Sequence, residues 1–183
     1  GVQTCALPIL WAQTNGVTSL SLLLIFTILS LCWLAAAWLW RTLFLPVCRA
    51  LLAGGLLFWL VALLGASRLA LTKELPILAG VLALTAASVW GWRQAAARLA
   101  WRELDASKWL LWPVMLLMVG YQLWHQQIVA AGWSNLAWCV ALPAALMLLR
   151  RDGERLLPRI AMGLHLSLFW MILLALAAEL YWF

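Results

Sequence analysis

The sequence predicts an all-α fold: a polytopic transmembrane helical bundle of about six spans plus one short interfacial helix. Three observations lead to this prediction. Hydrophobic residues make up 67% of the 183 residues and charged residues only 10%, whereas soluble domains have about 45–50% and about 25%. The apolar residues gather in runs long enough to cross a bilayer. The positively charged residues fall between those runs and not within them.

The first residues differ from the rest of the chain. Residues 1–9, GVQTCALPI, resemble the translated frame of a sequencing-library adapter. We therefore expect residues 1–16 to stand outside the bundle and residues 17–183 to form one transmembrane helical region. The chain also ends within an apolar run, so we expect it to be a fragment of a larger protein.

Six apolar runs are candidate membrane spans. A helix needs about 20 residues to cross a hydrocarbon core of roughly 30 Å. The runs are apolar on every face, which favours lipid-embedded helices over barrel strands, because barrel strands alternate apolar and polar residues. Glycines 54 and 55 and the alanines of the third and fifth runs permit close helix approach, and an equally good interpretation is that Gly and Ala are simply common in membrane helices. The predicted spans are residues 17–40, 50–67, 75–92, 109–124, 128–149 and 160–182.

The connection 93–108 is longer than a turn and predicts the short interfacial helix. Ala97, Ala100, Trp101 and Leu104 recur at helical spacing, which indicates one apolar stripe. Such a helix would lie in the headgroup layer. Two interpretations stay open: the segment recognises anionic lipid, or it is a connector whose arginines set the topology.

Charge placement orients the predicted spans. Loops on one side hold ten Lys and Arg residues, and the opposite side holds only Arg68 and Lys73. By the positive-inside rule the ten-cation side is cytoplasmic. We expect a multi-pass protein of the bacterial inner (cytoplasmic) membrane, with both ends of the chain in the periplasm. The ten cations are Arg41, Arg49, Arg93, Arg98, Arg102, Lys108, Arg150, Arg151, Arg155 and Arg159.

Few residues could carry chemistry. His125 ends the fourth run and Glu179 lies near the end of the sixth, both on the predicted outer side. A His and a carboxylate can form an acid–base pair, so these two are the candidate catalytic residues. His165 is expected to be packed and bonded to a neighbouring helix. The sequence contains no GxSxG, HExxH, P-loop or GxGxxG motif and no aspartate pair.

Residues 109–182 carry a familiar pattern: WLLWPVMLL, a turn with His125, the step Gly132–Trp133, the basic loop Leu149–Arg151, and a closing helix that ends Glu179–Trp182. This pattern resembles bacterial polytopic membrane proteins of domain-of-unknown-function family 2339. The family's frequent His-Pro is His125-Gln126 here. The resemblance implies a longer parent protein with many more helices and no established activity.

These observations predict an integral membrane protein that is a structural or binding component of the bacterial cell envelope. One alternative is a membrane enzyme or carrier that handles lipid-linked or envelope glycans at the outer face through His125 and Glu179. Another is a segment of a transporter. We expect no cofactor and no metal. The expected partners are the lipid bilayer and the remaining helices of the parent chain. The net charge of +6 is explained by topology, so we expect no nucleic acid partner.

Overall fold

The computed structural model describes residues 19–71, 74–124, 133–153 and 158–182. In these ranges all regular secondary structure is helical, which confirms the predicted all-α class. A helix covers most of each predicted span. The helices are α2 (Ser19–Trp40), α3 (Leu45–Ala70), α4 (Glu74–Arg98), α5 (Arg102–Asp105), the 3-10 helix η1 (Ala106–Leu110), α6 (Leu111–Trp124), α7 (Trp133–Asp152) and α8 (Pro158–Trp182).

Length and composition single out two described helices, α2 and α3, as able to cross a membrane, whereas about six spans were predicted. Of α8, the described stretch Pro158–Leu174 is apolar but shorter. Helix α6 has 14 residues, which gives a length of about 21 Å at 1.5 Å per residue. The last turn of α7 carries Arg150, Arg151 and Asp152, which shortens its apolar part.

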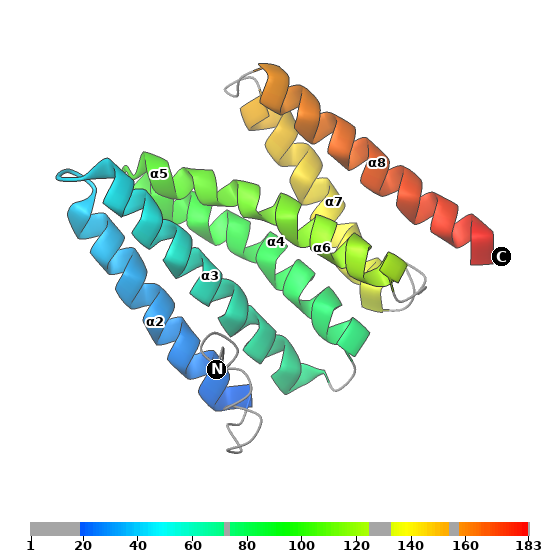
Figure 1. The fold of residues 1–183 in the computed structure, drawn as a ribbon, viewed down its shortest axis with the longest axis horizontal. Helices are drawn as coiled ribbons and strands as arrows, with labels where there is room; N and C mark the ends of the chain where they lie inside the picture. Colours follow the sequence, from blue (N-terminus) through cyan, green and yellow to red (C-terminus); the bar gives the residue numbers. More distant parts are fainter. Residues whose placement is uncertain (1–18, 72–73, 125–132, 154–157, 183) are drawn as a thin grey trace, which may run out of the picture. The chain divides into compact units, whose positions relative to one another are not determined.

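The chain divides into two compact units, residues 1–73 and 74–183. Within the first, α2 and α3 lie side by side as an antiparallel hairpin, here called the N-terminal hairpin (Figure 1). Its turn is short, because the amides of Leu43 and Phe44 both donate to Trp40 O at 3.1 Å. A proline then stands at the start of α3, where its missing N–H costs little.

Small residues bring the two helices of this hairpin together. A Cβ built on Gly65 would lie 2.9 Å from Leu23 N, so only glycine fits without a shift of the backbone. A Cβ on Gly55 would lie 3.1 Å from the Leu34 side chain. At the same level the Ser30 hydroxyl, which is buried, donates to Gly55 O at 2.8 Å. The prediction that Gly55 permits close approach is confirmed.

The second unit, here called the C-terminal bundle, consists of α4 to α8. Helix α4 packs most extensively on α7 and also contacts α5, η1 and α6, while α8 makes fewer contacts, with α6 and α7 (Figure 1). Alanines on α4 and α7 are buried, as expected for helices that approach closely. They are Ala79, Ala86 and Ala96 on α4 and Ala137, Ala141, Ala144 and Ala145 on α7.

The predicted single stripe over residues 97–104 is wrong. Helix α4 continues to Arg98, and both Ala97 and Ala100 are exposed. The chain then reverses at Ala100, whose φ is 48°. Trp101 N donates to Ala96 O at 2.9 Å and Ala100 N to Ala97 O at 3.4 Å, which is the Schellman pattern that ends a helix. Glycine is usual at the position of Ala100, so the residue types do not signal this end.

Candidate functional site: a buried charge cluster

The turn at Ala100 determines where the following residues lie. After it, α5 and η1 run back along α4, and Trp101 and Leu104 are buried there. Ser107 and Lys108 on η1 are buried as well. A lysine is very seldom buried unless its charge is paired. The segment that was predicted to be an interfacial helix therefore places the side chain of Lys108 inside the bundle.

Lys108 lies between two carboxylates. Its Nζ is 2.6 Å from Asp105 Oδ2 and 3.0 Å from Asp152 Oδ2, and Asp152 is the last residue of α7. Arg93 of α4 reaches the same Asp152 oxygen with Nη1 at 3.8 Å. These four residues, here called the charge cluster, join α4, α5, η1 and α7 at one end of the C-terminal bundle.

Burial is graded across the charge cluster. The side chains of Lys108 and Asp152 are 6% and 5% exposed, whereas those of Asp105 and Arg93 are 37% and 31% exposed. Burying a charge is costly unless it is paired and hydrogen-bonded. Two cations and two carboxylates balance one another here, so the cluster carries no net formal charge. Its inner pair is Lys108–Asp152, and the two half-exposed groups complete the pairing from outside.

The charge cluster is arranged for structure more than for catalysis. Lys108 Nζ already faces two carboxylates, which suits a structural ammonium and not a general base for the neighbouring Ser107 hydroxyl. Across the described ranges, no three His, Cys, Asp or Glu side chains are grouped so that they could hold a metal ion. Ion pairs of this kind link helix ends, and removing one partner leaves an uncompensated buried charge.

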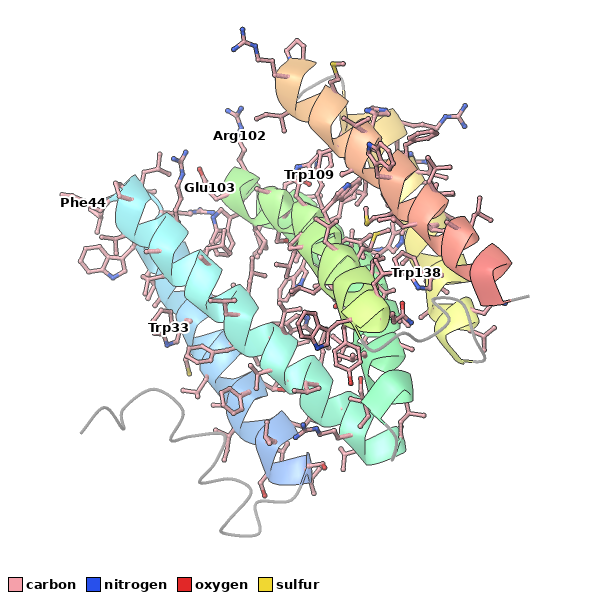
Figure 2. The ribbon with its side chains drawn as sticks, turned by 45° about the vertical axis from the view of Figure 1, so that its right-hand side comes forward. Trp33, Phe44, Arg102, Glu103, Trp109 and Trp138 are labelled. Atoms are coloured by element: carbon pink, nitrogen blue, oxygen red, sulfur yellow. The ribbon has the colours of Figure 1, made fainter. Side chains whose placement is uncertain are left out.

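In the C-terminal bundle, the described cations that were predicted to set the topology fall into two groups, those paired within the bundle and those exposed on its surface. Arg93 and Lys108 belong to the charge cluster and are paired internally. Arg155 lies outside the described residues. The other five in the C-terminal bundle are exposed and are here called the arginine rim: Arg98, Arg102, Arg150, Arg151 and Arg159. The remaining two, Arg41 and Arg49, belong to the N-terminal hairpin. Figure 2 shows Arg102 of this rim pointing away from the helices.

The predicted pair His125 and Glu179 stays a prediction. His125 lies outside the described residues, and of Glu179 only its position in α8 is described. Nearby on the predicted outer side, Gln122 is buried and Asn135 is exposed. His165 is exposed, with its Nδ1 2.7 Å from Ala161 O of the same helix. The expectation that His165 bonds to a neighbouring helix is therefore wrong.

Sequence reasoning missed both carboxylates of the charge cluster. Asp105 and Asp152 are far apart in the sequence, so they were not read as a pair, yet both meet Lys108. A partial signal exists, because Asp105 precedes Lys108 by three residues, the spacing of neighbours on a helix. Nothing comparable indicates Asp152.

Comparisons of the chain with known protein families, with curated proteins and with solved structures gave no match.

Proposed function

We propose that this chain is a multi-pass integral membrane protein with about six spans that acts as a structural or binding component of the bacterial cell envelope. In this proposal the charge cluster and the arginine rim lie on the cytoplasmic side of the inner membrane. The resemblance of residues 109–182 to domain-of-unknown-function family 2339 supports a polytopic bacterial protein. The proposal concerns both units.

One observation carries the proposal: the C-terminal bundle exposes many large apolar side chains, while a few polar side chains are buried beside its apolar core. Gln122, Lys108 and Asp152 are buried. Leu117 on α6 is 72% exposed and Met162 on α8 is 73% exposed. Further exposed apolar side chains follow α6, α7 and α8: Leu116, Leu136, Val140, Leu146, Met147, Leu166, Phe169 and Trp170.

Such a surface is unfavourable in water. Each Å² of apolar surface removed from water contributes about 25 cal/mol, and soluble monomers seldom expose apolar patches above a few hundred Å². Lipid tails would cover these side chains at no such cost. These exposed apolar side chains therefore support lipid as the solvent for α6, α7 and α8, in addition to α2 and α3, which are long and apolar enough to cross a membrane.

The short helix α6 can still be part of a span. Helix η1 leads directly into it, so residues 106–124 form one continuous helical run. Bilayers adapt to short apolar stretches by local thinning, and flanking side chains extend to the interface. Lys108 lies at one end of this run, where its charge is paired by the charge cluster.

A structural role follows from the charge cluster. It ties α4, α5, η1 and α7 at one end through side chains that are balanced in charge. Helix ends that are joined by ion pairs in this way are suited to a scaffold that holds other helices or binds a partner.

Cysteine labelling tests the proposal. In a variant without native cysteines, single cysteines replace Ala106, Gln126 and Leu117, and a membrane-impermeant maleimide is applied to inside-out and right-side-out vesicles. Ala106 and Leu117 are both exposed in the structure. We expect Ala106→Cys and Gln126→Cys to react from opposite sides, and Leu117→Cys to react from neither because lipid covers it.

Three results contradict the proposal. Rapid labelling of Leu117→Cys would mean that water and not lipid covers α6. Labelling of Ala106→Cys and Gln126→Cys from the same side would contradict the proposed topology. Release of the chain from membranes by alkaline carbonate would likewise show that it is not integral.

A further inference from the structure

We infer that the arginine rim binds the headgroups of anionic phospholipids. This inference rests on the proposed function and adds a ligand class and the residues that take it. It also decides between the two interpretations of the loop 93–108, because it assigns lipid recognition to Arg98 and Arg102 and a structural role to Arg93 and Lys108.

The rim residues gather at one end of the C-terminal bundle. Asp152 is paired with both Arg93 of α4 and Lys108 of η1, so the end of α7 lies against the ends of α4 and α5. Arg150 and Arg151 precede Asp152 directly, and Arg98 ends α4. Helix α8 begins at Pro158, shortly after the end of α7, and Arg159 is its second residue.

The charge of the rim is not neutralised by the described part of the chain. The carboxylates of Asp105 and Asp152 are already paired in the charge cluster. Glu103 is the other described carboxylate at this end, and it is half-buried. Among the described residues, the recorded ion pairs involve none of the five rim arginines. Five exposed guanidinium groups therefore face at most one uncommitted carboxylate among the described residues.

The neighbours of the rim favour lipid as its partner. Leu146 and Met147 lie one helical turn before Arg150 and Arg151, and both are exposed. Ile160, which follows Arg159, is exposed as well. The arginines thus border the apolar surface, at the level where phosphate groups would meet acyl chains. Guanidinium groups bind phosphate oxygens through paired hydrogen bonds, and anionic headgroups attract such cations.

The test compares lipid binding by variants of equal charge. The purified chain in neutral micelles at low salt receives equal amounts of dioleoyl phosphatidylglycerol and dioleoyl phosphatidylcholine, and native mass spectrometry counts the bound lipids. A cation near an anionic surface contributes about fivefold in binding. We expect phosphatidylglycerol to be enriched in the unmodified chain, and Arg150→Gln/Arg151→Gln to reduce the enrichment by about tenfold or more.

The matched control is Arg49→Gln/Arg68→Gln on α3. It removes the same charge from two exposed positions outside the C-terminal bundle, and we expect it to keep most of the enrichment. Equal binding of both lipids by the unmodified chain overturns the inference, and so does an equal loss in the control variant. A chain that resists carbonate extraction but shows no lipid preference refutes only this inference, whereas a chain released by carbonate refutes the proposed function.

Discussion

The N-terminal hairpin and the C-terminal bundle hold their helices together in different ways. In the hairpin, Gly65 lets the backbone of α3 approach Leu23 of α2, and one hydroxyl, that of Ser30, bonds across to Gly55 O. In the bundle, charged side chains tie helix ends, with Lys108 and Asp152 at the centre. The hairpin depends on shape, and the end of the bundle depends on charge balance.

This difference teaches which substitutions each unit tolerates. Replacing a glycine at a close helix crossing, such as Gly65, by any other residue destabilises the hairpin. The opposing atoms belong to the backbone of α2 and cannot rotate away. Removing one partner of a buried ion pair destabilises the protein, because the other charge stays buried and unpaired. Replacing both partners by apolar groups of similar size is tolerated. The following predictions separate these two behaviours, from the largest expected effect to the smallest.

Asp152→Asn is expected to be the most damaging change. It leaves the buried Lys108 with only the half-exposed Asp105 as a partner, and breaking a buried pair costs about 3–5 kcal/mol. Asp105→Asn is the matched control, and because Asp105 is more exposed we expect a loss below about 1 kcal/mol. The free energy of unfolding is measured by SDS titration in mixed micelles, followed by tryptophan fluorescence.

A double variant sharpens this prediction. Lys108→Met/Asp152→Leu removes both charges and should recover much of the stability lost in Asp152→Asn. Equal losses for Asp152→Asn and Asp105→Asn would mean that burial does not distinguish the two carboxylates, and the charge cluster would lose its structural role.

Gly65→Ala tests the hairpin. The new Cβ would lie 2.9 Å from Leu23 N and 3.2 Å from Leu23 Cα, so the two helices must move apart. We expect a loss of about 1–3 kcal/mol in the same unfolding measurement. Gly120→Ala on α6 is the control, because nothing lies within 4 Å of its Cβ position. A Gly65→Ala chain as stable as the unmodified chain would show that the close crossing does not contribute.

Ser30→Ala is expected to have the smallest effect. It removes the hydrogen bond to Gly55 O, and such bonds between membrane helices average about 0.6 kcal/mol. The control is Ser88→Ala, whose hydroxyl bonds to Thr85 O within α4, so that no contact between helices is lost. A loss for Ser30→Ala as large as that for Asp152→Asn would contradict the view that shape and not polarity holds the hairpin.

The extent to which the sequence predicted each helix depends on how that helix ends. The end of α2 at Trp40 coincides with the predicted end, because the apolar run stops there. Helix α4 instead continues beyond Trp92 to Arg98, since charged residues end an apolar run without ending a helix. The true stop at Ala100 has no glycine to signal it.

The sequence by itself determined that the described chain is helical and where its cations gather. Both properties are local: a run of apolar residues satisfies its backbone only within a helix when lipid surrounds it, and the cations fall between the apolar runs. Only the tertiary structure decided which cations are free. Lys108 became buried because α5 and η1 fold back on α4 and meet the end of α7, and a one-dimensional pattern does not contain which helices are neighbours.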